Sequence, residues 1–173
     1  MRRLIRTIPR SARKAKSKKI IAALQRAMVF KRARNIMTYV ALPEEVQTWD
    51  LIRQARALDK RVFVPKIEPK SRCMMAVEVI DPAKELKKGT YGILAPKQTR
   101  GRILNPRHLD LVIVPGVGFD PRGRRLGRGK GYFDRFLKKA THARKIGLAF
   151  REQMVKKIPA GPQDVPMDRV LTD

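Results

Sequence analysis

The sequence is poor in the residues that build disulfides and zinc sites. It contains one cysteine, Cys73, and two histidines in 173 residues. A single cysteine excludes a disulfide within the chain and favours a reducing compartment. With so few soft ligands, any metal would be a hard cation on oxygen atoms rather than zinc. No run of residues approaches the ~20 apolar residues that a membrane-spanning helix needs.

Acidic residues are also scarce, and they are unevenly placed. The chain has 41 lysines and arginines against 15 acids, a net charge of +26, and no acid precedes Glu44. This excess favours an anionic partner such as a nucleotide or a nucleic acid, although a compositional bias of the surface would produce it too. Residues 1–19 share the acid-poor character of an organellar presequence. Helical spacing continues from them into the fold, which argues against a presequence. We expect a basic, flexible arm over residues 1–17.

Alternating periodicities predict an α/β fold. Apolar residues follow helical spacing over residues 18–33 and 48–60, where Thr48 is a candidate helix cap. Strand-like runs occupy residues 35–42 and 61–67. This alternation is typical of a parallel sheet. Residues 110–116, DLVIVPG, are apolar at successive positions, which predicts a central strand buried on both faces.

The second half of the chain is less regular. We expect a strand over residues 73–80, a loop over 88–101, a helix over 132–140, a strand over 144–150 and a final strand near the end. The length suits one domain. The prediction is therefore a single α/β domain, residues 1–173, with a mainly parallel central sheet flanked by helices. Ligands of such sheets bind at the carboxyl ends of the strands.

A glycine-rich, basic loop follows the central strand. In PGVGFDPRGRRLGRGKGYFDRFL, residues 115–137, three glycines alternate with Arg128 and Lys130. Glycines allow backbone N–H groups to approach an anion closely, and the following helix start adds further donors. The loop therefore has the means to hold a triphosphate. It matches neither the Walker A nor the dinucleotide-binding pattern, and a solvated basic hairpin is the alternative interpretation.

Asp134 lies directly after the glycines, in the first turn of the expected helix. A carboxylate there interacts favourably with the helix N-terminus, or it serves as an oxygen ligand for a Mg²⁺ ion that bridges phosphates. The neighbouring phosphate loop favours the second role. Asp164 and Asp168 would complete such a site if the C-terminal segment folds back.

Residues 115–137 closely resemble the signature of the 5-formyltetrahydrofolate cyclo-ligase family, also called 5,10-methenyltetrahydrofolate synthetases. YVALPEEVQTWDLI, YGILAPK and IGLAFREQMVKKIPAGPQDVPMDRVLTD follow in family order. The resemblance implies that ATP phosphorylates the formyl oxygen of 5-formyltetrahydrofolate. N10 then attacks the formyl carbon, phosphate leaves, and the products are 5,10-methenyltetrahydrofolate, ADP and phosphate.

The resemblance also implies functional residues, with MgATP as co-substrate and Mg²⁺ as cofactor. Those that would bind ATP are Arg2, Arg6, Arg125, Leu126, Gly127, Arg128, Gly129, Lys130, Gly131, Tyr132 and Phe133. Those that would act in catalysis are Arg128, Lys130 and Tyr132. Those that would bind the folate are Val40, Glu45 and Tyr132. The metal ligands would be Asp134 and Asp164. We interpret Asp168 as structural and Trp49 as a packing residue, and without the resemblance Glu45 would pass for a solvated acid.

Three features depart from the family pattern. Phe133 replaces a second tyrosine, and Ala95 replaces a glutamate that usually precedes the proline of the central loop. The N-terminus is short, so that Arg2 and Arg6 match the family's arginine spacing only if several residues after them are deleted. The missing acid at residue 95 favours an alternative, a diverged enzyme that uses ATP on another substrate.

A second alternative is a non-enzymatic, basic nucleic-acid-binding protein on the same scaffold. Its support is the charge, but no RNA-binding signature occurs and only 6% of residues are aromatic, so any such binding would be nonspecific and salt-sensitive. We therefore expect 5-formyltetrahydrofolate, with or without a polyglutamate tail, and ATP as partners. The resemblance further suggests a monomer in the cytoplasm without membrane association.

Overall fold

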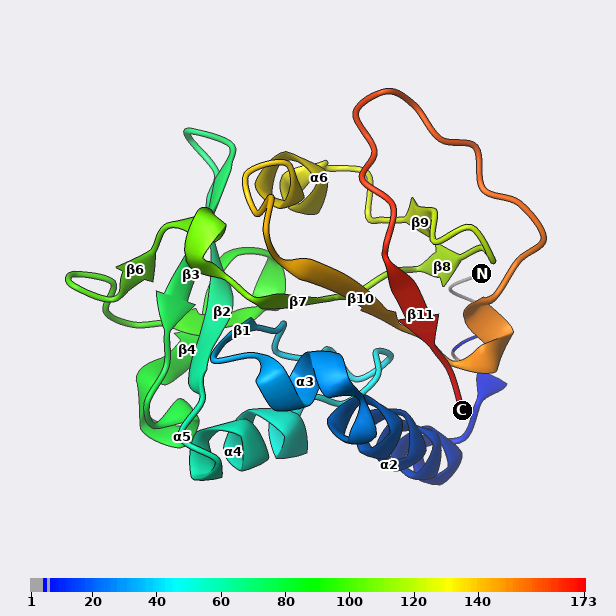
Figure 1. The fold of residues 1–173 in the computed structure, drawn as a ribbon, viewed down its shortest axis with the longest axis horizontal. Helices are drawn as coiled ribbons and strands as arrows, with labels where there is room; N and C mark the ends of the chain where they lie inside the picture. Colours follow the sequence, from blue (N-terminus) through cyan, green and yellow to red (C-terminus); the bar gives the residue numbers. More distant parts are fainter. Residues whose placement is uncertain (1–4, 6) are drawn as a thin grey trace.

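The computed structural model describes residues 5 and 7–173. Its centre is a seven-stranded sheet with the order β11-β10-β7-β1-β2-β3-β6 (Figure 1). The strands from β11 to β2 run parallel, whereas β3 and β6 are antiparallel to their neighbours. This arrangement confirms the predicted α/β fold with a mainly parallel sheet. The strand bounds are β1 (Asn35–Met37), β2 (Arg61–Glu68), β3 (Cys73–Glu78), β6 (Ile103–Leu104), β7 (Leu111–Val114), β10 (Arg144–Leu148) and β11 (Arg169–Leu171).

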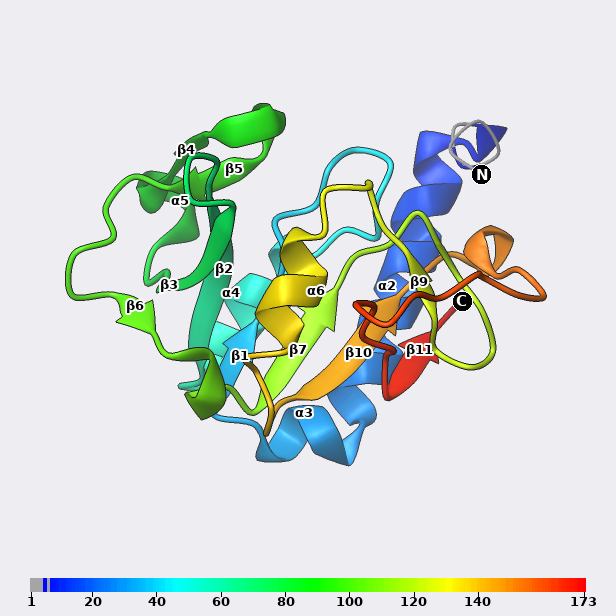
Figure 2. The ribbon, with the colours of Figure 1, turned by 90° about the horizontal axis from the view of Figure 1, so that it is seen from above.

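Helices cover both faces of the sheet and create two apolar cores. Three of them, α2 (Arg10–Arg26), α3 (Met28–Arg32) and α4 (Trp49–Ala57), pack on one face, and α6 (Tyr132–Leu137) packs on the other (Figures 1 and 2). Trp49 packs against the first core, as expected. No helix in the described part of the chain combines the length and apolar character needed to cross a membrane.

The strand β7 confirms the prediction of a doubly buried strand. Its four side chains are fully buried. Ile113 contributes to the core beneath α2 and α4, while Val112 and Val114 contribute to the core beneath α6. Successive side chains of a strand point to opposite faces, so an unbroken apolar run is what a strand between two cores requires.

The N-terminal region differs from the expectation. Helix α2 begins at Arg10, so residues 10–17 are helical rather than part of a flexible arm. The expected helix over residues 18–33 is divided at Ala27, whose extended backbone ends α2 and starts α3. Ser17 is buried within α2, where its hydroxyl donates to the Arg13 carbonyl at 2.7 Å. Contact with the rest of the fold extends this helix into a very basic segment.

Several other elements differ in length or detail. The expected strand over residues 35–42 ends at Met37. Thr48 occupies the N-cap position of α4, but its hydroxyl donates to the Tyr39 carbonyl instead of capping the helix. The expected loop over residues 88–101 contains part of a hairpin. The remaining elements are α5 (Pro82–Glu85), β4 (Leu86–Lys88), β5 (Leu94–Pro96), β8 (Gly118–Phe119), β9 (Arg125–Leu126) and the 3₁₀ turns η1 (Thr90–Gly92), η2 (Pro106–His108) and η3 (Arg151–Gln153).

Gly147 in β10 is a steric requirement of the second core. A Cβ atom at this position would lie 2.7 Å from Cε1 of the fully buried Phe119. We therefore expect Gly147→Ala to lower the free energy of unfolding by about 1–3 kcal/mol through overpacking, measured by urea denaturation. In the matched control Gly161→Ala the new methyl group would meet only an Asp164 oxygen, 3.9 Å away. Equal stability of the two variants would contradict this account of β10.

Candidate active site

A cleft of ≈ 710 Å³ opens at the carboxyl ends of β1, β2 and β7. The loop after β1 forms one wall, and the loop between β7 and α6 forms the opposite wall. The β4–β5 hairpin and the C-terminal segment close the ends. The cleft therefore lies at the edge of the sheet where a ligand site was expected.

The structure brings the predicted site residues together. Every one of them that lies among the described residues lines this single cleft, namely Val40, Glu45, Arg125, Leu126, Gly127, Arg128, Gly129, Lys130, Gly131, Tyr132, Phe133, Asp134 and Asp164. Arg2 and Arg6 lie outside the described residues. Asp168 is not part of the lining. It accepts a hydrogen bond from the Lys145 amide at 2.6 Å, next to β11, in agreement with a structural role.

The glycine-rich loop begins as a hairpin that a buried carboxylate holds. β8 and β9 pair in antiparallel fashion, so a hairpin is present, but the glycines that follow β9 face the cleft. Asp120 is 1% exposed and accepts hydrogen bonds from the amides of Arg122, Arg124 and Ile158, each at 3.0 Å. One side chain thus joins the hairpin to the C-terminal segment that closes the cleft.

Arg125 of β9 and Asp134 of α6 form an ion pair that links the two ends of the glycine-rich segment. The Arg125 Nη2 atom donates to both carboxylate oxygens of Asp134 at 2.9 Å, and the arginine side chain is only 5% exposed. The guanidinium also lies over the Phe133 ring, 5.7 Å from its centre. A Cβ atom on Gly127 would lie 2.6 Å from Arg125 Nη1, so this glycine leaves room for the arginine. The pair is not predictable from the sequence, because a separation of nine residues across a loop carries no periodic signal.

The two aspartates suit a cation that arrives with a nucleotide. Asp134 and Asp164 line the same cleft, and Asp164 Oδ2 accepts the Gly161 amide at 2.8 Å. Among the described residues no group of three or more acids, histidines or cysteines gathers as a metal site. Mg²⁺ is commonly bound through one or two carboxylates together with substrate phosphates. The donor chemistry suits a magnesium ion that takes its other oxygens from ATP and water, provided that Asp134 shares its oxygens with Arg125 Nη2 or releases them.

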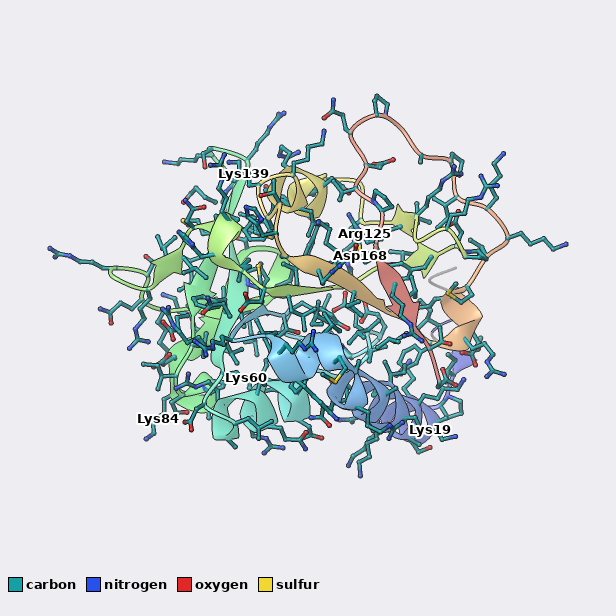
Figure 3. All side chains as sticks on the ribbon, in the orientation of Figure 1. Lys19, Lys60, Lys84, Arg125, Lys139 and Asp168 are labelled. Atoms are coloured by element: carbon teal, nitrogen blue, oxygen red, sulfur yellow. The ribbon has the colours of Figure 1, made fainter. Side chains whose placement is uncertain are left out.

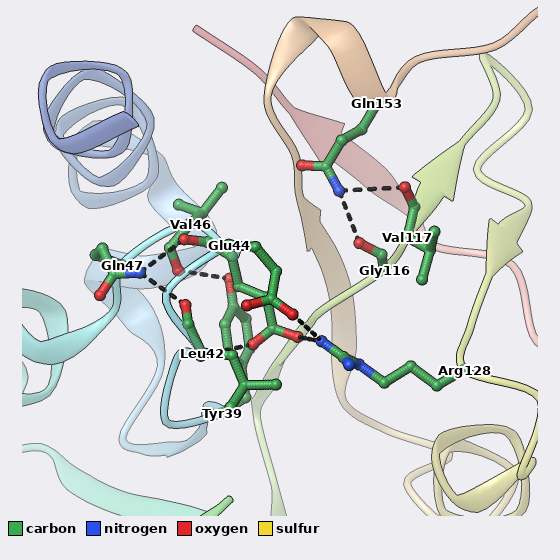
Figure 4. A network of polar contacts seen from close by, with 10 residues as sticks. Tyr39, Leu42, Glu44, Val46, Gln47, Gly116, Val117, Arg128 and Gln153 are labelled. Carbon is green, nitrogen blue, oxygen red and sulfur yellow. Dashed lines mark hydrogen bonds and ion pairs between the residues drawn. The ribbon is translucent and has the colours of Figure 1, made fainter. Parts of the chain in front are cut away.

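Several hydrogen bonds hold the cleft wall that is formed by the loop after β1. Glu45 Oε2 accepts the Leu42 amide at 3.0 Å. The Gln47 side chain donates to the carbonyls of Leu42 and Glu45 at 2.9 and 2.8 Å (Figure 4). The Tyr39 hydroxyl donates to the Val46 carbonyl at 2.9 Å, and burial raises the pKa of this phenol well above its usual range, so it remains a donor. The Glu45 carboxylate is thereby presented to the cleft in one orientation.

Arg128 crosses the cleft and joins its two walls. Its Nη2 atom lies 2.9 Å from Glu45 Oε1 and 3.3 Å from Glu44 Oε1 (Figure 4). Burial lowers the pKa of the Arg128 guanidinium, but the two carboxylates outweigh this effect and raise it above its usual value. Arg128 and Glu45 were predicted separately, as ATP-binding and folate-binding residues, and nothing in the sequence indicates that they contact each other.

Comparison with known proteins identifies the family. The sequence model of the 5-formyltetrahydrofolate cyclo-ligase family matches residues 1–173. The chain belongs to this family. It is accordingly an enzyme of the ligase class, and the cleft that collects the cyclo-ligase signature residues is its candidate active site.

Individual cyclo-ligases match over most of their length. A probable 5-formyltetrahydrofolate cyclo-ligase of Caenorhabditis elegans is 32% identical, covering 99% of this chain and 88% of that protein. The cyclo-ligase of Escherichia coli K12 is also 32% identical, covering 81% and 78%. The NMR structure of Aquifex aeolicus 5,10-methenyltetrahydrofolate synthetase superimposes with a TM-score of 0.84 at 31% identity, covering 98% of this chain and 86% of that one.

The buried Asp120 carboxylate gives a pH-dependent prediction. Burial raises its pKa, but the three amide hydrogen bonds outweigh burial and hold the pKa below its ordinary value. A lowered pKa stabilises the folded state above the unfolded pKa, and the contribution is lost as the pH falls through the folded pKa. We expect Asp120→Asn to lower the free energy of unfolding by about 1–3 kcal/mol at neutral pH, with the deficit shrinking below about pH 4.

Urea denaturation at neutral and acidic pH measures the Asp120 effect. The matched control is Asp50→Asn, which removes an exposed carboxylate paired with Arg53 on α4 and should cost little at either pH. A deficit for Asp120→Asn that stays constant down to strongly acidic pH would contradict the proposed cause.

Proposed function

We propose that this enzyme uses MgATP to convert 5-formyltetrahydrofolate to 5,10-methenyltetrahydrofolate. One observation carries the proposal: all described residues that the cyclo-ligase signature assigns to ATP, folate and metal line one cleft. Family membership supports the reaction class. The cleft lining combines Arg125, Arg128 and Lys130 with apolar side chains such as Val40 and Ile93, which supports the pairing of a nucleotide with a folate.

The chemistry requires charge neutralisation more than covalent help from the protein. The formyl oxygen attacks the γ-phosphorus of ATP, and ADP leaves. N10 then attacks the activated formyl carbon and loses its proton, the C–O bond breaks, and the former formyl oxygen departs with the phosphate. Phosphoryl transfer depends mainly on positioning and on compensation of charge. Arg128 and Lys130 would provide that compensation, and a bound Mg²⁺ would add to it from the side of Asp134 and Asp164.

The wall formed by the loop after β1 would receive the folate. Val40 on this wall and Ile93 on the neighbouring β4–β5 hairpin give apolar surface against which a pterin ring can lie, and Glu45 offers carboxylate oxygens to its N–H donors. Tyr132, at the start of α6, would lie near the formyl group. Because the loop carrying Glu45 is held by several hydrogen bonds, this acceptor would be placed before substrate arrives.

Ala95 supports a second candidate function, ATP-dependent chemistry on a related substrate. It lines the cleft from β5, where the family pattern usually has a glutamate. A methyl group there removes one potential contact to the folate. The nucleic-acid alternative is less well supported, since the labelled Lys19, Lys84 and Lys139 lie in three separate parts of the view rather than in one patch (Figure 3).

Turnover tests the proposed reaction directly. Growth of the near-ultraviolet absorbance of the methenyl product is expected only when 5-formyltetrahydrofolate, ATP and Mg²⁺ are all present. Lys130→Gln should lower kcat/KM for ATP by about 10²–10³, the cost of one transition-state charge contact. Lys139→Gln removes the same charge from an exposed position outside the cleft and should leave kcat/KM unchanged.

The outcomes separate the candidate functions. A flat absorbance trace alongside measurable MgATP binding would favour the related-substrate function, and Ala95→Glu would then be the first variant to assay. A protein that shows no turnover and binds no nucleotide would refute both candidate functions. Equal losses in Lys130→Gln and Lys139→Gln would refute the specific role of the loop.

A further inference from the structure

The ion pair between Arg128 and the Glu44–Glu45 dipeptide joins two groups that the proposed function assigns to different ligands. Arg128 is assigned to the triphosphate, and Glu45 is assigned to the folate. The two residues are 83 positions apart in the chain and contact each other across the cleft at 2.9 Å. In the structure, therefore, the group assigned to the triphosphate is paired with the group assigned to the folate.

The two sides of this ion pair are not equally anchored. Glu45 keeps a second hydrogen bond, from the Leu42 amide to Oε2, and its loop is tied to α2 because the Gln47 amide donates to the buried Ser17 hydroxyl at 3.1 Å. Arg128 lies between two glycines. Gly129 has a φ of +82° and no atom within 4 Å of the place where a Cβ would stand. The carboxylate is thus the fixed partner and the guanidinium the movable one.

A polyphosphate competes directly for the movable partner. It carries more negative charge than the two carboxylates and presents several oxygens to a guanidinium, which favours charge-assisted pairing. When Arg128 turns to the phosphates, Glu45 Oε1 loses its partner while Oε2 remains on the Leu42 amide. A correctly oriented acceptor oxygen then becomes available to the folate.

We propose that Arg128 is a latch across the active-site cleft, and that nucleotide phosphates open it and so strengthen folate binding. The proposal rests on the proposed function and deepens it, because it makes Arg128 a positioning residue for folate as well as a contact for ATP. Coupling between two ligands is reciprocal, so folate must strengthen nucleotide binding by the same factor. A partly exposed ion pair sets the size of the effect at about two- to fivefold.

Calorimetric titration of the whole protein with 5-formyltetrahydrofolate tests the latch. The dissociation constant is measured alone, with Mg²⁺ and inorganic tripolyphosphate, and with Mg²⁺ and a nonhydrolysable ATP analogue. In the wild type both additions should tighten folate binding about two- to fivefold. Arg128→Gln should bind folate tightly without any addition and should not respond to either. Arg122→Gln removes an exposed charge from the β8–β9 hairpin that precedes Arg128, outside the cleft, and should behave as wild type.

Three results would overturn the latch. An unchanged wild-type dissociation constant under all conditions, in a protein that turns over MgATP and folate, would refute the latch and leave the proposed function intact. Tightening by the ATP analogue that persists in Arg128→Gln would assign the coupling to other residues. Absence of both turnover and folate binding in the wild type would refute the proposed function, and the latch with it.

Discussion

Strand β7 lies between β1 and β10, in parallel register with both, and its side chains enter the cores on both faces of the sheet. Most of the architecture depends on this position. Because its neighbours run in the same direction, the chain leaves β7 at the edge where it also leaves β1 and β2. The loop after β7 therefore faces the loop after β1, and the cleft between them follows from the topology of the sheet.

Four of the 15 acids of this basic chain fix the geometry of the cleft. Asp120 holds the hairpin that precedes the glycines, Asp134 holds the buried Arg125, and Glu44 and Glu45 hold Arg128. Each pair places a cation or a loop at the cleft without adding to its net positive charge. A site for polyphosphate needs such compensation, because uncompensated guanidinium groups in a narrow space would repel one another and splay the loop.

The fold class and the cleft-lining residues were predictable from sequence, whereas the contacts among those residues were not. Composition and periodicity reveal β7, since a strand between two cores must be apolar at every position. The glycine-rich loop is recognisable because its chemistry depends on residue types in a contiguous segment. By contrast, the contact of Arg128 with Glu45 depends on how two distant loops meet. The break between α2 and α3 at Ala27 is not marked by a proline or a glycine. The Thr48 hydroxyl donates to the buried Tyr39 carbonyl instead of capping its own helix, and this contact depends on the tertiary fold.

The antiparallel β2–β3 hairpin has a practical consequence for following ligands in this cleft. Met74 lines the cleft, and the preceding residue is the exposed Cys73. Because this is the chain's sole thiol, a maleimide dye would attach at one position, beside the cleft wall but outside its lining. Because successive side chains of a strand point to opposite faces, the dye would lie on the other side of β3 from Met74, and energy transfer from it to a fluorescent ligand would follow occupancy in real time without altering any residue of the candidate active site.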